Sequence, residues 1–195
     1  EKLDPALHGA ALWDAMKVEP TLWDYMPYGP FGSSEQFQSW IAERAALTDP
    51  YVYAIVAPDS RALGIAALMR ITPETGVIEV GHIAYSPALQ RTPLGTEAQF
   101  LLARYAFDTL GYRRYEWKCN ALNAASRRAA ERYGFTFEGI FRQHMIVKGK
   151  NRDTAWYSII DTRWPARRAA FEHWLARSNF DAQGRQIASL ASFRA

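Results

Sequence analysis

The chain has 195 residues, of which 49% are hydrophobic and 14% aromatic, so it is long enough to form one sizeable core. Its formal net charge of +3, from 23 Lys and Arg against 20 Asp and Glu, is too small to indicate a nucleic-acid-binding protein. No apolar run approaches the roughly 20 residues of a membrane span, and no leader segment is recognisable. The single cysteine excludes an internal disulfide and fits a reducing compartment. We therefore expect one cytoplasmic domain over residues 1–195 that binds neither nucleic acid nor a membrane.

Hydrophobic periodicity predicts helices alternating with strands along the chain. In chain order, the expected elements are helices at 5–17 and 34–47, strands at 51–57, 64–71, 77–85 and 115–119, helices following residues 92 and 123, strands at 136–141, 143–148 and 154–161, and a helix at 165–177. The polar tail from about 179 is expected to be loosely held as far as Ile187 and Leu190. Because these two side chains are expected to pack either on this molecule or on a second one, a homodimer stays open.

The strand expected at 77–85 places its side chains alternately on two faces. One face carries Val77, Glu79, Gly81, Ile83 and Tyr85, and the other carries Ile78, Val80, His82 and Ala84. Glu79 and His82 are therefore expected on opposite faces unless a bulge intervenes, and they are not expected to act together.

The turn after this strand has the features of an anion site. Thr92 is a preferred helix N-cap, and Pro93 suits the first helical position because its missing N–H would be unpaired there anyway. The amides of Leu94, Gly95 and Thr96 would then point outward at the positive end of the helix dipole. The pattern predicts either a cradle for a phosphate or pyrophosphate or an ordinary strand-to-helix turn.

A second strand-to-helix segment makes the pattern more specific. The strand at 115–119 is followed by Asn123 and Ser126, and the helix that they open ends at Gly134. Together with Glu79-Val80-Gly81 and the segment Gln90-Arg-Thr-Pro-Leu-Gly-Thr-Glu-Ala98, this order and spacing resemble the GCN5-related N-acetyltransferase (GNAT) superfamily. The likeness is to its ribosomal-protein N-acetyltransferase-like (RimJ/RimL-like) branch, and it covers nearly the whole chain.

The resemblance implies a single α/β (α+β) domain with a central mixed, mostly antiparallel sheet of about seven strands flanked by helices. It also implies acetyl-CoA as the cosubstrate, with no metal. The superfamily pattern Gln/Arg-x-x-Gly-x-Gly/Ala places Gln90 at its first position and Gly95 at its last, with Pro93 in place of the first glycine. The implied coenzyme A contacts come from the strand, the turn and both helix starts: Ile83, Tyr85, Gln90, Arg91, Thr92, Leu94, Gly95, Thr96, Asn123 and Ser126.

Transfer of an acetyl group to an amine requires a neutral amine, so a nearby group has to accept its proton. Glu79 is the leading candidate for this base, and His82, Glu116 and Glu138 are reserves. Many members of the superfamily carry a tyrosine acid where this chain has Ala130, so Ser126 is the candidate to donate a hydrogen bond to the departing sulfur. A backbone amide between Ile83 and Tyr85 would stabilise the thioester oxyanion. For Cys119, a buried structural role is favoured over that of a nucleophile.

The amine acceptor is expected to contact the aromatic segment between the first two helices, through Trp23, Tyr25, Tyr28 and Phe31, and also His82. The same segment would equally suit a lid on the core. The acceptor itself stays open between a protein N-terminus and a small amine, and the acyl group between acetyl and succinyl. Two other functional classes are a non-catalytic coenzyme A-binding module and an RNA-binding protein that uses the basic cluster of Arg142, His144, Lys148, Lys150 and Arg152. For that cluster a solvated hairpin with its turn at 149–151 is favoured.

Overall fold

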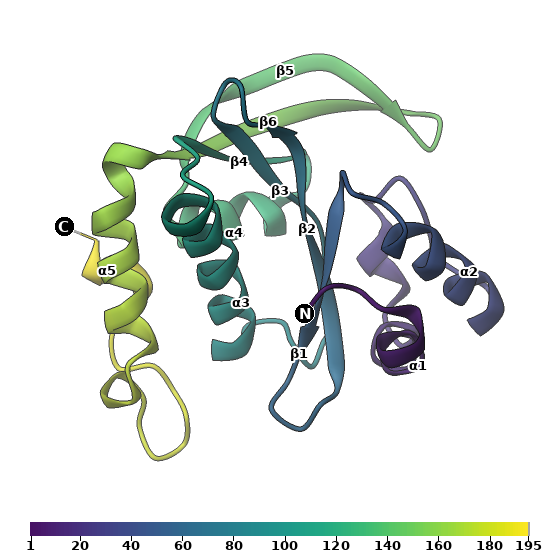
Figure 1. Cartoon of the computed structure of the whole chain (residues 1–195), viewed down its shortest axis with the longest axis horizontal. Helices are drawn as coiled ribbons and strands as arrows, with labels where there is room; N and C mark the ends of the chain where they lie inside the picture. The colour runs from purple at the N-terminus through teal and green to yellow at the C-terminus, as the bar shows by residue number, and fades with distance from the viewer. Residues whose placement is uncertain (195) are drawn as a thin grey trace.

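The computed structural model describes residues 1–194, which form a six-stranded mixed sheet between two layers of helices (Figure 1). The strands follow the order β1-β2-β3-β4-β6-β5, and among them β3 and β4 are parallel while the other neighbours are antiparallel. Their bounds are β1 (Tyr51–Val56), β2 (Ala62–Thr72), β3 (Val77–Tyr85), β4 (Arg114–Asn120), β5 (Thr136–Val147) and β6 (Lys150–Ile160). The expected fold class is confirmed.

The sheet has six strands where the sequence predicts about seven, because the strands expected at 136–141 and 143–148 are one strand, β5. The pairing of β5 with β6 shifts between Phe141 and Met145, and Gln143 has a left-handed φ of +50° there. A bulge of this kind bends a strand without ending it. The interrupted hydrophobic pattern around Gln143 therefore looks like a break between two strands in the sequence.

Helices cover both faces of the sheet (Figure 1). One face carries α1 (Pro5–Met16), the 3-10 turn η1 (Pro20–Trp23) and α2 (Ser34–Ala45). The other face carries α3 (Pro93–Arg104) with its π-helical extension η2 (Tyr105–Thr109), α4 (Ala124–Tyr133) and α5 (Trp164–Leu175). Three short turns lie beside α5: η3 (Asp161–Arg163), η4 (Arg177–Asn179) and η5 (Leu190–Phe193). The core under α1 and α2 takes its strand residues from β1, β2 and β3. The same face of β4 and β6 lies outside this core and carries charged side chains together with Trp156.

Two bulges change which face a residue occupies, and both lie where β2 pairs with β3. The register shifts between Ile65 and Ala67, opposite His82, and again after Met69, at Arg70. His82 and Arg70 have left-handed φ values of +49° and +48°, which are uncommon for residues other than glycine. Each bulge turns a polar side chain onto the α1/α2 face, so the strict alternation expected for 77–85 is wrong after Gly81.

The β5–β6 hairpin reaches back over the α1/α2 side of the molecule (Figure 1). Its turn is Lys148-Gly149, with φ values of +49° and +71° as in a type I′ turn, so the turn expected at 149–151 begins one residue too late. Lys148 Nζ donates to the carbonyl oxygens of Trp23 at 2.9 Å and Gly29 at 2.6 Å. The tip of the hairpin is thus fixed to the aromatic segment that follows η1.

The C-terminal tail is held on α5 by the side chain of Asn179. Its amide donates to the carbonyls of Trp174 and Ala188, both at 3.1 Å, and its oxygen accepts the N–H of Ala188 at 2.9 Å. Leu190 is 2% exposed and belongs to the core under α3, α4 and α5, whereas Ile187 is 70% exposed. Of the two residues expected to pack, Leu190 therefore packs on this molecule and Ile187 faces solvent.

Asn179→Ala should lower the free energy of unfolding by about 1–3 kcal/mol, because it leaves buried backbone groups without their partners. Urea denaturation followed by tryptophan fluorescence measures this loss. Gln183→Ala, in the exposed part of the same tail, is the control and should change stability by less than about 0.5 kcal/mol. Equal stability of the two variants would show that Asn179 does not hold the tail.

Candidate functional site

The two parallel strands of the sheet are paired along only part of their length. Residues Val77–Val80 of β3 pair with Arg114–Trp117 of β4, and beyond these the pairing stops. From there β3 continues against β2, while β4 continues against β6 as far as the pair Asn120–Thr154. The sheet therefore opens between β3 and β4 at the ends from which α3 and α4 begin.

The edge of β3 that faces this opening carries backbone groups that β2 does not use. The N–H of Ser86 donates to Leu63 of β2 at 3.0 Å, so the strand alternation directs the N–H of Tyr85 away from β2. The carbonyl of Tyr85 on this edge accepts a bond from Gln90 Nε2 at 2.8 Å. The side chain of Gln90 is thus placed at the opening, while its neighbour Arg91 is exposed, with a φ of +59°.

Helix α3 begins with Thr92 as its N-cap and Pro93 at its first position, as expected. The Thr92 hydroxyl accepts the N–H of Gly95 at 3.1 Å, and the Thr92 carbonyl accepts the N–H of Thr96 at 3.3 Å. Two of the three amides expected to point outward are therefore used within the first turn. In residues 1–194, the N–H of Leu94 is the one of the three without a partner.

Close packing explains why a glycine occupies position 95. A Cβ there would lie 2.8 Å from the carbonyl oxygen of Leu89 and 3.3 Å from the Tyr85 ring. A positive charge also reaches this helix end, because Arg132 of α4 donates to the Thr96 hydroxyl at 3.1 Å. The first turn of α3 thus combines close backbone approach, a free amide and a nearby guanidinium.

Helix α4 begins beside the last paired residue of β4. Asn123 is its N-cap and accepts the N–H of Ser126 at 3.0 Å, and the Ser126 hydroxyl accepts the indole N–H of Trp117, also at 3.0 Å. Burial raises the pKa of the Cys119 thiol, and the nearby Ser126 hydroxyl only partly offsets this. Ala130, where many members carry a tyrosine, is fully buried.

On the opposite face, a chain of ion pairs crosses the sheet where it lacks a helical cover. Glu79 Oε2 accepts bonds from Arg70 at 2.5 Å and Lys118 at 2.9 Å, and Lys118 also pairs with Glu116 at 2.6 Å. Arg114 then joins Glu116 to Glu138. The side chains of Glu79, Lys118 and Glu116 are only 4%, 6% and 9% exposed, so the charges depend on one another.

The ion pairs lower the pKa of both reserve carboxylates, Glu116 and Glu138. Burial alone would raise the pKa of Glu116, but hydrogen bonds from Lys118 and Arg114 outweigh it and the pKa is lowered. A hydrogen bond from Arg114 is the main cause that lowers the pKa of Glu138, which also accepts a bond from Ser158 at 2.6 Å. Both reserve candidates for the base are therefore anions held by fixed cations.

The bulge at His82 brings its ring to the same face as Glu79, which corrects the expectation that the two are separated. His82 Nδ1 is hydrogen-bonded to the Tyr28 hydroxyl at 2.7 Å, and the two rings are stacked. Burial, with the charges of Arg44 and Arg70, lowers the pKa of His82 to about 4, so the ring is neutral at pH 7. Burial also raises the pKa of Tyr28.

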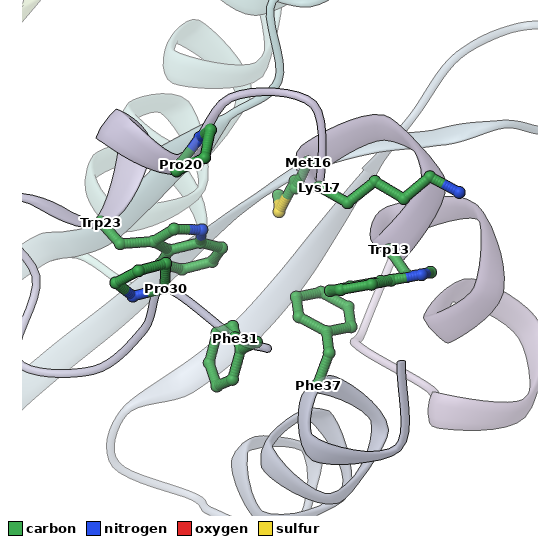
Figure 2. A pocket seen from close by; sticks show the side chains of 8 residues that line it. All are labelled: Trp13, Met16, Lys17, Pro20, Trp23, Pro30, Phe31 and Phe37. Atoms are coloured by element: carbon green, nitrogen blue, oxygen red, sulfur yellow. The ribbon is translucent and has the colours of Figure 1, made fainter. Parts of the chain in front are cut away.

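The aromatic segment divides into core and site residues. Trp23 is 3% exposed and packs edge-on against Phe31 and Phe37 at the small, roughly 30 Å³ cavity between α1, η1 and α2 (Figure 2). The Tyr28 ring lies between Trp23 and His82 and contacts both. The Tyr25 hydroxyl donates to the carbonyl of Leu122 at 3.2 Å. The structure thus places Tyr25, Tyr28 and His82 near the opening, and Trp23 and Phe31 behind them in the core.

Sequence reasoning missed Lys118, Arg70 and Arg114, which link the candidate bases. A signal was present in β4, where Arg114, Glu116 and Lys118 recur at every second residue and so mark a charged face. The position of Arg70 had no such signal, because it depends on a bulge. Among residues 1–194 no group of three or more His, Cys, Asp or Glu side chains is placed to hold a metal ion, and no helix is long and apolar enough to cross a membrane.

Comparisons with known proteins place the chain in a family. The model of the GNAT acetyltransferase domain matches residues 3–136. A solved GCN5-related N-acetyltransferase from Brucella melitensis is 47% identical, with a TM-score of 0.97 over 100% of this chain and 89% of that one. A solved probable GNAT-family acetyltransferase from Chromobacterium violaceum is also 47% identical, with a TM-score of 0.80 over 85% of this chain and 84% of that one.

A curated relative supports the same family. The probable N-acetyltransferase YjcK of Bacillus subtilis is 30% identical over 122 residues, which are 61% of this chain and 66% of that protein, just under two thirds of its length. The chain belongs to the GNAT acetyltransferase family, whose members are acyl-CoA-dependent acetyltransferases. The ribosomal-protein branch stays a prediction.

Lys118→Met should destabilise the protein by about 3–5 kcal/mol, because it leaves Glu79 and Glu116 as buried carboxylates without their shared cation. Chemical denaturation at pH 7 measures this change. The matched control is Arg61→Met, which removes an exposed pair with Asp59 and should change stability by less than about 1 kcal/mol. A Lys118→Met variant as stable as the control would show that the buried chain of charges does not depend on Lys118.

Proposed function

We propose that the protein transfers the acetyl group of acetyl-CoA directly to a small primary amine, with the coenzyme on the α3/α4 face and the amine on the α1/α2 face. The observation that carries this proposal is the opening between β3 and β4 beside the starts of α3 and α4. Acetyl-CoA supplies the acetyl group as a thioester. Succinyl-CoA or another acyl-CoA is the alternative donor, and a protein N-terminus is the alternative acceptor.

Several groups at the opening would suit coenzyme A. The N–H groups of Ile83 and Tyr85 would hydrogen-bond the extended arm, as a neighbouring strand would. The amide of Leu94 and the positive end of α3 would hold the pyrophosphate, with Arg132 providing a counter-charge. Gln90, Arg91, Thr92, Gly95, Thr96 and Asn123 would complete the site.

Three groups of this chain would carry the chemistry. Glu79 would accept the proton of the amine, directly or through water, from the acceptor face of β3. A backbone N–H between Ile83 and Tyr85 would stabilise the developing oxyanion. The Ser126 hydroxyl, already fixed by Trp117, would donate to the departing sulfur. Because burial keeps the Cys119 thiol protonated, direct transfer is favoured over a covalent intermediate on this residue.

The position of Glu79 suits a base despite its ion pairs. Arg70 and Lys118 both bind Oε2, and the other oxygen, Oε1, lies 3.6 Å from the position that a Cβ on Gly81 would take. Gly81 is the first β3 residue beyond the pairing with β4, and the Met69 side chain packs over it beside Oε1, because a Cβ there would lie 2.5 Å from Met69 Sδ. His82, neutral and on the same face, is the alternative base.

Gly95→Glu should abolish binding of acetyl-CoA, because the side chain collides with Leu89 and adds negative charge where a pyrophosphate would sit. A thermal-shift titration with acetyl-CoA measures the binding. At an acetyl-CoA concentration of one hundred times the dissociation constant, the wild type should gain about 2.7 kcal/mol of stability, or roughly 5–10 °C in Tm. NAD is the control ligand and Gly149→Glu the control variant. A folded Gly95→Glu protein that shows the full thermal shift with acetyl-CoA would mean that the pyrophosphate does not bind at this turn.

Glu79→Gln should lower kcat at least about 100-fold while the affinity for acetyl-CoA stays within about twofold, as expected for loss of a general base. The loss should shrink as the pH rises, because the fraction of neutral amine grows. Glu74→Gln, in the exposed turn before β3, is the control. A kcat at the wild-type level in folded Glu79→Gln would assign the base to His82 or to water.

Release of free coenzyme A distinguishes the enzyme from a binding module. A non-catalytic module would keep the thermal shift and release no thiol with any amine. The same assay with succinyl-CoA ranks the two acyl groups.

A further inference from the structure

The chain of ion pairs on the acceptor face is balanced in charge. Its cations are Arg70, Lys118 and Arg114, and its anions are Glu79, Glu116 and Glu138. Each anion binds at least one cation, so this network holds no excess of either sign. Any further charge beside it has to be matched by solvent or by a ligand.

Arg152 is such a further charge. It lies on β6 two residues before Thr154, which pairs with Asn120 at the end of β4, so it extends past the end of β4. The alternation of β6 puts it on the face of Thr154 and Trp156, which is also the face of Lys118. Its side chain is therefore directed to the acceptor side of the opening.

The guanidinium of Arg152 is held in place but not neutralised. Its Nε donates to the hydroxyl of buried Thr154 at 3.2 Å, and His144 Nδ1 is 3.0 Å from the same hydroxyl. Within residues 1–194, no carboxylate lies within 4.0 Å of Arg152. Burial is the main cause that lowers the pKa of Arg152, and the Glu79 carboxylate acts against it. The two terminal nitrogens of a half-buried cation are thus available on the acceptor side of the opening.

Hydrogen bonds fix the aromatic segment to three other parts of the molecule. The aromatic segment is tied to the β5–β6 hairpin through Lys148, to β3 through Tyr28 and His82, and to the turn before α4 through Tyr25 and Leu122. Two more arginines, Arg44 and Arg70, lie near His82 on this side and lower its pKa. The Nε of Arg44 is buried and has no hydrogen-bond partner. Positive side chains on this side of the sheet favour a ligand with a negative charge.

We propose that the acceptor is a small amine that also carries a carboxylate, the simplest class being the α-amino acids, and that Arg152 binds this carboxylate. The inference rests on the proposed function. A carboxylate matches the planar fork of a guanidinium and would supply the charge that the chain of ion pairs leaves unmatched.

The same charges disfavour two other kinds of acceptor. A polyamine would bring several positive charges next to Arg152, which has no carboxylate of residues 1–194 beside it to offset them. A protein N-terminus carries an amide where an amino acid carries its carboxylate, so it would leave Arg152 unpaired. Both would lose the interaction that distinguishes this site.

The test compares matched acceptors in the presence of acetyl-CoA, and the release of free thiol measures their turnover. Each standard amino acid is paired with its amide and, where available, with the amine that lacks the carboxyl group. The best amino acid should have a kcat/KM at least about tenfold above that of its amide, since a charged hydrogen-bonded pair contributes about 1.5–3 kcal/mol. Arg152→Gln should raise KM for that amino acid by about tenfold or more and leave the amide unchanged.

Two further variants make the result specific. Arg152→Lys keeps the charge without the planar fork and should recover part of the affinity. Arg142→Gln removes an exposed arginine from the same hairpin and should behave like the wild type. The carboxylate proposal would be overturned if the amides were turned over as well as their acids, or if Arg152→Gln had no effect on KM. Either result would leave acetyl transfer intact. The absence of thiol release from every acceptor would instead overturn the acetyltransferase function on which it rests.

Discussion

The end of the pairing between β3 and β4 is the constraint on which the rest of the site depends. After the pair Val80–Trp117, β4 stays with β6, whereas β3 stays with β2 and is bent by its bulge at His82. A bulge increases the local twist of a strand, so the two parallel strands separate instead of continuing side by side. Unused backbone groups, two helix starts and the candidate base then meet at one opening.

The bulges also decide which side chains face the acceptor. Without the extra residue in β3, His82 would point to the α3/α4 face, and without the one in β2, Arg70 could not reach Glu79. Left-handed φ values at residues other than glycine cost about 1–3 kcal/mol each, and they persist only where the surroundings hold them. Here the Tyr28–His82 and Arg70–Glu79 bonds do so, which links backbone strain to the composition of the site.

Much of the fold could be predicted from the sequence, because periodicity and caps are local signals. Thr92 and Asn123 cap the expected helices, and the strand expected at 77–85 has the same bounds in the structure. The strand count and the face of His82 could not be predicted, since a bulge leaves the composition unchanged while it shifts every later side chain. The partners of Glu79 were equally hidden, because Arg70 and Lys118 come from two other strands.

The two faces of the opening differ in a way that suits direct transfer. On the α3/α4 face the features are backbone amides, a helix start and Arg132, which fit an extended phosphate-bearing ligand. On the other face the features are a paired carboxylate, a neutral histidine and an unmatched arginine, which fit a small charged acceptor. A sheet normally separates its two faces with a continuous row of paired strands. Because the pairing of β3 and β4 stops at the base of both proposed sites, an amine and a thioester bound there would approach each other without either leaving its own side.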